Sequence, residues 1–305
     1  MITASVVLYK TPQEQIDTII RSFKPSEDRR LIFVDNSGEN AENFLAGQQV
    51  FDEPQFAANK NGGTSDGNRQ ASYNTSKVGN AIDYISMGKN LGYGSAHNIA
   101  IKKAIELGSE FHVVLNPDLS FEPSVIDELA DYARAHEDVV YMLPEVVNEA
   151  GEIQHLCKLL PTPSDLIFRR FLSFLPSASA KNDRYILLNS GYDHIMNVPC
   201  LSGCFMFMRT AALAKYDLLF DERFFMYCED FDLMRRLHRI GKTIYYPLVQ
   251  ITHHHERSSY HSLKMLCHHT ASAIRYFNKY GWWHDPERDR VNAEAKWEIA
   301  DSVGN

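Results

Sequence analysis

Short apolar runs alternate with amphipathic stretches through the first part of the chain. Residues 2–9 form a β-branched apolar run, and the apolar positions of residues 16–23 then recur at the spacing of one helix face. Residues 31–34 follow as a second short apolar run. The order strand, helix, strand predicts a βαβ unit, whose parallel strands bind ligands at their carboxyl ends.

The same rhythm continues to residue 143. A strand is predicted at residues 82–87, and a glycine-rich loop leads from it into a helix of about residues 95–107, with Gly108 as its stop. Residues 11–14, Thr-Pro-Gln-Glu, predict a capping box for the first helix. The remaining predicted elements of this half are a strand at 111–115, a helix at 124–136 and a strand at 139–143. We therefore expect an α/β fold with a mostly parallel central sheet.

The pattern is less regular in the second half. Prolines interrupt short apolar patches over residues 144–195, which we expect to be irregular. Strand character returns at 198–208, a helix is predicted at 229–240, a strand at 243–246 and a last helix at about 262–280. Residues 59–80, rich in Asn, Gly, Ser and Thr, are predicted to be a mobile surface insertion.

These patterns predict one large domain followed by a helical extension. We expect one domain over residues 1–250, divided into halves at 1–143 and 144–250, followed by a helical extension over residues 251–305.

Charge, hydropathy and cysteine content narrow the class of protein. Of the 305 residues, 31 are Lys or Arg and 39 are Asp or Glu, which gives a net charge of −8. This negative charge argues against a protein that binds nucleic acid over its whole surface. The start lacks the basic region of a signal peptide, and no stretch reaches the roughly 18 apolar residues of a membrane span. Five scattered cysteines suit a reducing compartment. We expect a cytoplasmic protein whose membrane contact, if any, is peripheral.

Polar residues follow three of the predicted strands and are the first site candidates. Tyr9 and Asp35 stand at strand ends, and Asp118 closes a tight Asn-Pro-Asp turn after a third strand. A single carboxylate suffices for Mg²⁺ or Mn²⁺ when phosphate and water complete the shell, so Asp118 predicts a cation that holds a nucleotide diphosphate. The alternative is that Asp118 merely caps a turn.

Glu229 and Asp230 open a helix just after an aromatic run at residues 224–227. Carboxylates at a helix start are ordinary, because they interact favourably with the helix dipole. The functional alternative is a general base, since a carboxyl group beside aromatic walls has a raised proton affinity and takes a proton from a hydroxyl group.

Six of the 13 histidines lie between His253 and His269. They have no zinc-type spacing, and three consecutive histidines on a strand cannot all point at one ion. One histidine joining Asp118 on a cation is the more economical hypothesis. The loop at residues 92–94 lacks the G-x-G-x-x-G spacing, and no P-loop is present, which argues against dehydrogenases and P-loop NTPases.

Six segments in this order resemble the family 2 glycosyltransferases, and within them the bacterial rhamnosyltransferases of O-antigen and cell-wall assembly. They are VVLY at 6–9, VDNS at 34–37, KNLGYGSAHNIAI at 89–101, LNPDL at 115–119, FFMYCEDFDLMRRL at 224–237 and ITHHHERSS at 251–259. The resemblance covers about residues 1–280. It implies a GT-A fold, which is Rossmann-like and binds a nucleotide sugar, with a divalent cation and inversion at the anomeric carbon.

The resemblance also implies roles for individual residues. Asp118 and His253 would hold the cation, Asp230 would be the catalytic base beside Glu229, and Arg257 would help to stabilise the leaving group. The implied donor-binding residues are Val7, Leu8, Tyr9, Asp35, Asn90, Gly92, Asn116, Asp118, Arg236 and Arg257. Asn116 replaces the first carboxylate of the family's metal motif. The insertion at 59–80 and the triple histidine depart from the common pattern, so His254 and His255 stay alternatives to His253.

The implied reaction is transfer of L-rhamnose from dTDP-rhamnose to a polyprenyl-diphosphate-linked saccharide at the inner face of the membrane. Alternatives are another nucleotide sugar, such as a UDP-linked hexose or galactofuranose, a sugar nucleotidyltransferase, or a binder of sugar nucleotides without catalysis. The last helix and the residues that follow it are the candidate membrane surface. Its basic and interfacial aromatic side chains are Lys264, Arg275, Lys279, Tyr276, Phe277, Trp282 and Trp283. Packing of this helix on the catalytic domain is the other interpretation.

Overall fold

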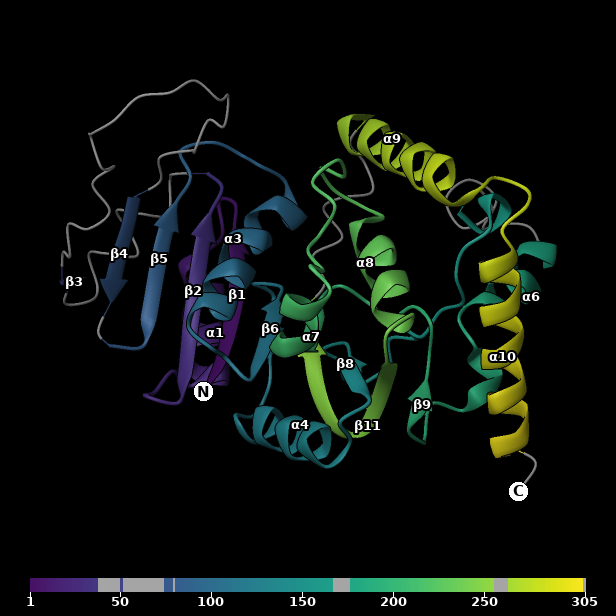
Figure 1. Cartoon of the computed structure of the whole chain (residues 1–305), viewed down its shortest axis with the longest axis horizontal. Coiled ribbons are helices and arrows are strands. Elements are labelled where there is room, and N and C mark those ends of the chain that lie inside the picture. The colour runs from purple at the N-terminus through teal and green to yellow at the C-terminus, as the bar shows by residue number, and fades with distance from the viewer. Residues whose placement is uncertain (38–49, 52–73, 79, 167–175, 255–262, 304–305) are drawn as a thin grey trace.

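The computed structural model describes residues 1–37, 50–51, 74–78, 80–166, 176–254 and 263–303. Its centre is a row of four parallel strands in the order β5 (Ile82–Ser86), β2 (Arg29–Asp35), β1 (Ile2–Leu8) and β6 (Phe111–Leu115). Their carboxyl ends share one edge of the sheet, shown at the top of Figure 1. The predicted βαβ start and mostly parallel sheet are confirmed.

The sheet continues beyond β6 with mixed directions. Strand β10 (Phe205–Arg209) runs antiparallel between β6 and β8 (Val139–Val147), and β11 (Lys242–His253) runs parallel to β8. Two short strands, β7 (Leu119–Ser120) and β9 (Met196–Asn197), pair antiparallel with β11. This half therefore reaches back to β7, which directly follows the Asn-Pro-Asp turn.

Helices cover both faces of the parallel strands. Alternate residues of β2 separate the two sides: Leu31 and Phe33 pack with α1 (Gln13–Phe23), whereas Ile32 and Val34 pack with α3 (Tyr93–Glu106). Successive side chains of a strand point to opposite faces, so α1 and α3 lie on opposite sides of the sheet. The remaining helices before α8 are α4 (Ser124–Ala135), α6 (Pro176–Tyr185), η1 (Leu188–Ser190) and α7 (Thr210–Lys215). Of these, α6 lies away from the parallel strands, beside α10 in Figure 1.

Three helices form the C-terminal part of the structure: α8 (Glu229–His238), α9 (Leu263–Tyr280) and α10 (Pro286–Val303). The start of α10 docks on α8 through the buried guanidinium of Arg235, which bonds both carboxylate oxygens of Asp285 at 2.6 and 2.7 Å. Figure 1 shows α9 crossing above α8 and α10 running down the opposite side from β5.

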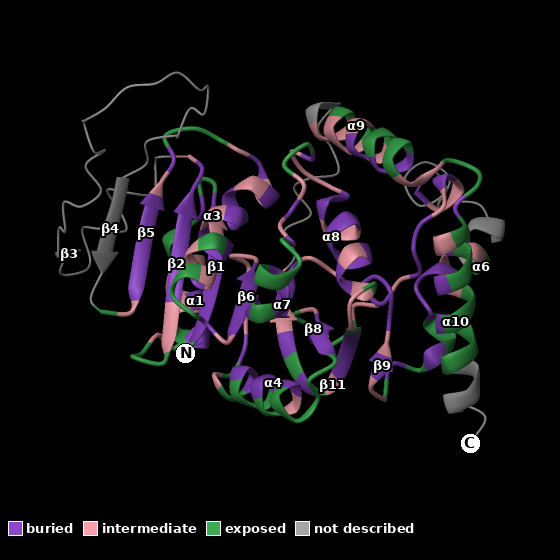
Figure 2. Cartoon of the chain, in the orientation of Figure 1, coloured by how far each residue is buried: buried purple, intermediate pink, exposed green. Residues whose placement is uncertain are grey.

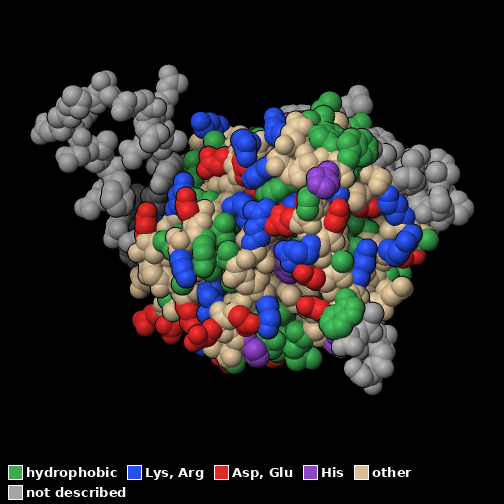
Figure 3. Space-filling model, turned by 45° about the vertical axis from the view of Figure 1, so that its right-hand side comes forward, with side chains coloured by type: hydrophobic (Ala, Val, Ile, Leu, Met, Phe, Trp, Pro, Cys, Tyr) green, Lys and Arg blue, Asp and Glu red, His purple; other side chains and the backbone are tan. Residues whose placement is uncertain are grey.

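The last predicted helix packs on the domain. Tyr276 and Phe277 are 1% and 3% exposed and pack with Leu166 and Phe224, although Figure 2 shows most of α9 as intermediate or exposed. The prediction that these two aromatic residues face a membrane is therefore wrong, and the packing interpretation is right for them. No helix among the described residues is long and apolar enough to cross a membrane. On the face seen in Figure 3, acidic and basic side chains are mixed over the surface.

Several local predictions need correction. Thr11 does not cap α1: Pro12 is the N-cap residue, and the Thr11 hydroxyl accepts the Tyr9 N–H instead. Part of the predicted insertion, Asn74–Val78, forms strand β4, which pairs antiparallel with β5 and with β3 (Val50–Phe51). The rest of that insertion up to residue 73 lies outside the described residues.

Element lengths also differ from the predictions. Strand β8 extends to Val147, β10 begins only at Phe205, and β11 runs on to His253. Helices α6 and α7 were not predicted, because their apolar positions are few or irregularly spaced. Helix α10 lies within the predicted helical extension, although its bounds were not predicted. The domain division at residue 250 stays a prediction.

Candidate active site

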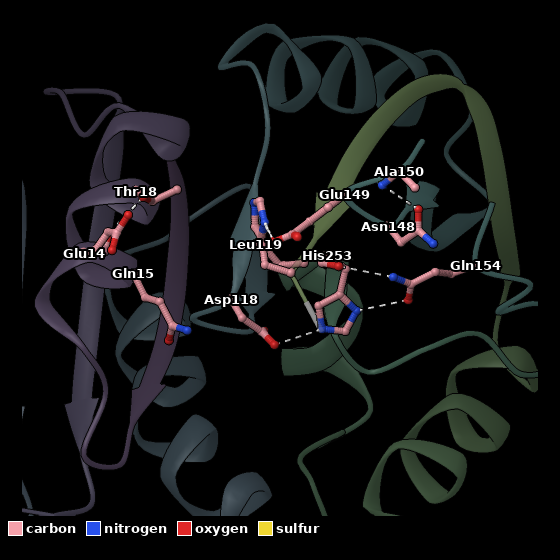
Figure 4. Close-up of a pocket in the computed structure, with 11 residues that line it drawn as sticks. Glu14, Gln15, Thr18, Asp118, Leu119, Asn148, Glu149, Ala150, Gln154 and His253 are labelled. Carbon is pink, nitrogen blue, oxygen red and sulfur yellow. Dashed lines mark hydrogen bonds and ion pairs between the residues drawn. The ribbon is translucent and has the colours of Figure 1, made fainter. Parts of the chain in front are cut away.

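Pairing between β7 and β11 brings Asp118 and His253 together. Leu119 is opposite His253 in this antiparallel pair, and the His254 N–H donates to the Asp118 carbonyl oxygen at 2.8 Å. The His253 Nε2 atom then lies 3.3 Å from Asp118 Oδ2. On its other side, His253 Nδ1 lies 3.3 Å from Gln154 Oε1, and Figure 4 shows the ring held between the two side chains.

This pair has the chemistry of a divalent cation site. The second carboxylate oxygen of Asp118, Oδ1, is buried and has no hydrogen-bond partner among the described residues, and an unpartnered buried oxygen is a ready ligand for a hard cation. Within the described part of the chain no group of three or more potential ligands occurs. The residues therefore fit a cation that takes two protein ligands and completes its shell with phosphate and water.

The three consecutive histidines separate as the strand geometry requires. His254 points away from Asp118: its Nε2 lies 2.7 Å from Ser120 Oγ and its Nδ1 lies 2.9 Å from Glu149 Oε1. His255 lies outside the described residues. Among the described histidines of this run, His253 is the one whose ring contacts the Asp118 carboxylate.

A cavity of about 790 Å³ opens beside the Asp118–His253 pair. Its walls come from α1, from the turn after β8 and from the ends of β7 and β11, as Figure 4 shows. The lining residues are Glu14, Gln15, Thr18, Asp118, Leu119, Asn148, Glu149, Ala150, Gln154, His253 and His254.

Glu229 and Asp230 stand at the first two positions of α8, after an N-cap residue, Cys228, in a left-handed conformation. Glu229 is 6% exposed, and burial followed by the charge of Asp230 holds its pKa well above the usual value. Burial also raises the pKa of Asp230, but Lys158 and the backbone N–H groups of Phe231 and Gly203 act in the opposite direction. The two neighbouring carboxyl groups therefore differ in proton affinity.

Tyr93 connects the cation pair with the start of α8. Its hydroxyl group lies 2.8 Å from the Gly203 carbonyl oxygen and 3.0 Å from Asn116 Oδ1. Burial and the nearby carboxylates of Glu229, Asp230 and Asp118 hold the pKa of Tyr93 well above its usual value. Tyr93 thus links Asn116, two residues before Asp118, with Gly203, where an added Cβ atom would lie 3.0 Å from Asp230 Cβ.

Known proteins of similar sequence carry names of one reaction class. A protein of Mycobacterium tuberculosis named N-acetylglucosaminyl-diphospho-decaprenol L-rhamnosyltransferase is 27% identical over 268 residues, which cover 82% of this chain and 84% of that protein. Rhamnosyltransferase WbbL of Escherichia coli is 28% identical over 223 residues, 70% of this chain and 79% of that protein. No model of a known protein family matches the chain.

Solved structures share the fold at low sequence identity. The mannosyltransferase PcManGT of Pyrobaculum calidifontis, in complex with GDP-Man and Mn²⁺, has a TM-score of 0.56 at 13% identity, over 98% of this chain and 69% of that one. Residues 1–349 of S. aureus TarS, in complex with UDP-GlcNAc, have a TM-score of 0.53 at 14% identity, over 96% and 70%. The chain is a glycosyltransferase with the GT-A fold. The predicted resemblance to rhamnosyltransferases is confirmed.

Lys158 of the glycosyltransferase is a site residue that the sequence did not reveal. It lies in the region predicted to be irregular, pairs through its backbone with Cys200, and places Nζ 5.5 Å from the centre of the Phe231 ring. Its charge acts on Asp230. The sequence feature that could have indicated it is a single lysine within the otherwise apolar run of residues 156–161.

Four of the predicted donor-binding residues, those expected to hold the nucleoside base, gather at the ends of β1 and β2. Asp35 is fully buried, accepts the Ser37 N–H at 2.8 Å and accepts the Tyr84 hydroxyl at 2.5 Å. Leu8 is buried, Val7 is partly buried, and Tyr9 is 53% exposed at the strand end. The structure therefore leaves Tyr9 most accessible.

Asn90 and Gly92 shape the loop that leads into α3. Asn90 Oδ1 accepts the Gly92 N–H at 2.9 Å, and Asn36 Nδ2 donates to the Gly92 carbonyl oxygen at 3.0 Å. Gly92 has φ of +88°, and a Cβ atom there would lie 2.3 Å from the Phe225 carbonyl oxygen. Only glycine fits this approach between α3 and the loop before α8.

Two other predicted donor residues are placed differently. Arg236 lies in the second half of α8, where Nε donates to Asp232 Oδ2 at 2.9 Å and Nη2 donates to the Leu219 carbonyl oxygen at 2.6 Å. These contacts belong to the packing between α8 and its neighbours, and its donor role stays a prediction. Arg257 lies outside the described residues.

Proposed function

We propose that the glycosyltransferase moves L-rhamnose from dTDP-rhamnose to a polyprenyl-diphosphate-linked saccharide, with inversion at the anomeric carbon. The observation that carries the proposal is the Asp118–His253 pair, together with Tyr93, which bonds Asn116 beside this pair and Gly203 beside Asp230. The names of the two relatives support rhamnose as the sugar, and the mycobacterial name supports a lipid-linked acceptor.

Asp230 is the proposed general base. The acceptor hydroxyl attacks the anomeric carbon, its proton passes to the Asp230 carboxylate, and the bond between that carbon and the diphosphate oxygen breaks with its electron pair on the leaving group. Burial raises the pKa of Asp230, while Lys158 and the backbone N–H groups of Phe231, Asp230 and Gly203 act against this rise and favour the ionised form. Glu229, with its pKa held well above the usual value, is the neutral partner whose protonation removes repulsion.

Asp118 and His253 are the proposed ligands of a Mg²⁺ or Mn²⁺ ion. When bound, such an ion neutralises charge on the departing diphosphate. The chain contributes Asp118 Oδ1, which is buried and unpartnered among the described residues, and a His253 ring oriented by Gln154. The nucleoside is proposed to lie against Val7, Leu8, Tyr9 and Asp35, with Asn90, Gly92 and Asn116 toward the ribose and phosphates.

Two substitutions test these roles. Asp230→Asn keeps the side-chain shape but removes the base, so transfer is expected to fall by about 10²–10⁴-fold while donor affinity stays within a few-fold. Glu229→Gln is the matched control, because an amide replaces a neutral carboxyl group, and it is expected to retain much of the activity.

Asp118→Ala addresses the cation. Donor binding is expected to weaken together with transfer. It is measured as the thermal shift that dTDP-rhamnose produces in the presence of Mn²⁺, and UDP- and GDP-sugars are measured for comparison. Activity unaffected by both EDTA and Asp118→Ala would remove the cation from the proposal. Full turnover by Asp230→Asn would assign the base elsewhere, and release of pyrophosphate would indicate a nucleotidyltransferase.

We also propose that the enzyme works at the inner face of the cell membrane, because the acceptor named for the mycobacterial relative is lipid-linked. Arg275 is exposed in the last two turns of α9, and Trp282 and Trp283 are exposed between α9 and α10, where Trp283 is 85% exposed. Aromatic and basic side chains of this kind favour the membrane interface.

A further inference from the structure

The loop that leads into α8 has an uncommon backbone. Tyr227 and Cys228 are consecutive residues with φ of 68° and 64°, a left-handed conformation that residues other than glycine rarely adopt. Such residues persist where their surroundings over-determine them, often at active sites. The turn ends directly at Glu229 and Asp230, so whatever holds it also sets where the Asp230 carboxylate lies.

Two helices hold this turn through consecutive carbonyl groups. The Phe225 carbonyl oxygen accepts the backbone N–H of Tyr93, at the start of α3, at 3.1 Å. The Met226 carbonyl oxygen accepts the Ser272 hydroxyl of α9 at 2.7 Å. Ser272 is 1% exposed, so bulk water does not replace this donor if it is removed.

Side chains add to the contact between α9 and the turn. The rings of Phe225 and His268 are stacked with centroids 4.8 Å apart, and those of Tyr227 and His269 are 5.2 Å apart. Residues of α9 therefore meet three consecutive residues of the loop. Farther along, Tyr280 of α9 donates to Asp232 of α8 at 2.7 Å, so the same helix fixes both the turn and the helix that it starts.

We propose that Ser272 is a positioning residue for the transfer reaction: its hydrogen bond to Met226 holds the left-handed turn at Tyr227 and Cys228, and thereby places the Asp230 carboxylate against the acceptor hydroxyl. The inference rests on the proposed role of Asp230 as the base. It makes α9, which the sequence assigns to an extension, part of the catalytic apparatus.

Ser272→Ala removes the donor and leaves the helix intact. We expect kcat to fall by about 10- to 100-fold, because a displacement of roughly 1 Å at a reacting group costs about that much. The donor KM and the dissociation constant of dTDP-rhamnose are expected to stay within about twofold, since Asp118 and His253 lie on other elements. The assay uses dTDP-rhamnose, a GlcNAc-diphospho-polyprenol acceptor and Mn²⁺, with calorimetry for donor binding.

Two further variants separate positioning from general damage. Thr270→Ala removes an exposed hydroxyl group from the same helix and is expected to keep the activity of the unmodified enzyme. Ser272→Cys keeps a weak donor of similar size and is expected to recover part of kcat.

An unchanged kcat in Ser272→Ala would overturn the inference, as would an equal loss of kcat and donor affinity. Asp230→Asn is measured in parallel. If it is inactive while Ser272→Ala is fully active, the positioning role fails and the proposed function stands; if it is fully active, the proposed base itself is wrong.

Discussion

At the scale of single residues, the start of α8 shows how two adjacent carboxyl groups acquire different chemistry. Glu229 is buried, and its Oε2 atom has no hydrogen-bond partner among the described residues. Asp230 is less buried, accepts the Phe231 N–H at 2.9 Å and lies within the influence of Lys158. Environments that separate two proton affinities assign one group as the neutral acid and the other as the base.

Lys158→Met should therefore change the pH dependence of transfer. Loss of the cation raises the pKa of Asp230, so the acidic limb of the kcat/KM profile is expected to move to higher pH while activity at alkaline pH changes little. Methionine keeps an apolar stem against Phe231, and Lys158→Arg, which keeps the charge, is the control. The other titratable groups that sense Asp230, namely Glu229, Cys228, Tyr93 and Tyr141, are present in both variants. An acidic limb that does not move would show that Lys158 does not tune the base.

At the scale of elements, α9 and α10 are tied to α8 by charge and by aromatic packing. Lys279, predicted to face a membrane, instead bonds Asp221 at 2.8 Å and also contacts Asp232. Tyr276 is buried and its ring packs edge-on against that of Phe277, with centroids 5.4 Å apart. The residues left for a membrane are those at the exposed junction of the two helices.

Vesicle flotation tests that junction. The enzyme is expected to float with anionic vesicles at low salt and to dissociate at high salt, because one arginine near such a surface contributes only about 1 kcal/mol. A variant with Arg275, Trp282 and Trp283 all changed to Ala should lose flotation. Trp297→Ala is the matched control, since this tryptophan is 69% exposed but lies in the second half of α10. Equal flotation of all three proteins would exclude the junction as the membrane-binding surface.

At the scale of the whole molecule, a buried polar chain runs between β1, β6 and α3. Ser5 Oγ lies 2.8 Å from His97 Nδ1 and 2.9 Å from His112 Nε2, and His112 Nδ1 lies 2.8 Å from Thr3 Oγ1. Both histidines are fully buried. Burial lowers the pKa of His112 to about 3 and holds the pKa of His97 well below its usual value.

These two buried histidines predict a loss of stability in mild acid. The unfolded histidines take up protons below about pH 6.5, whereas the folded ones do not, so the free energy of unfolding falls as pH drops from 6.5 toward 3. The slope is at most about 1.4 kcal/mol per pH unit for each histidine. Denaturant unfolding of the enzyme at several pH values measures it. His112→Gln should flatten the dependence, and His284→Gln, at an exposed position, should not. A dependence that is equally steep in His112→Gln would assign the effect to other groups.

Local patterns in the sequence were sufficient for the first half of the fold and for part of the site. The spacing of apolar residues predicted β1, α1, β2 and α3, because burial of one helix face or of both strand faces repeats within a few residues. Asp118 and Asp230 became candidates because a strand end and a helix start are recognisable locally. The strand-end position of Asp35 was predictable for the same reason.

Tertiary structure alone decided what each of these residues faces. His253 meets Asp118 only because β7 pairs with the end of β11, and the charge that lowers the pKa of Asp230 comes from Lys158, in a segment without local periodicity. The burial that raises the pKa of Glu229 and the Ser272 hydrogen bond to the turn before α8 both depend on contacts between distant segments. Sequence periodicity carries no record of such contacts, since they depend on how finished elements pack. The sequence thus determined the elements and the chemical groups at their ends, and packing determined which of those groups form the site.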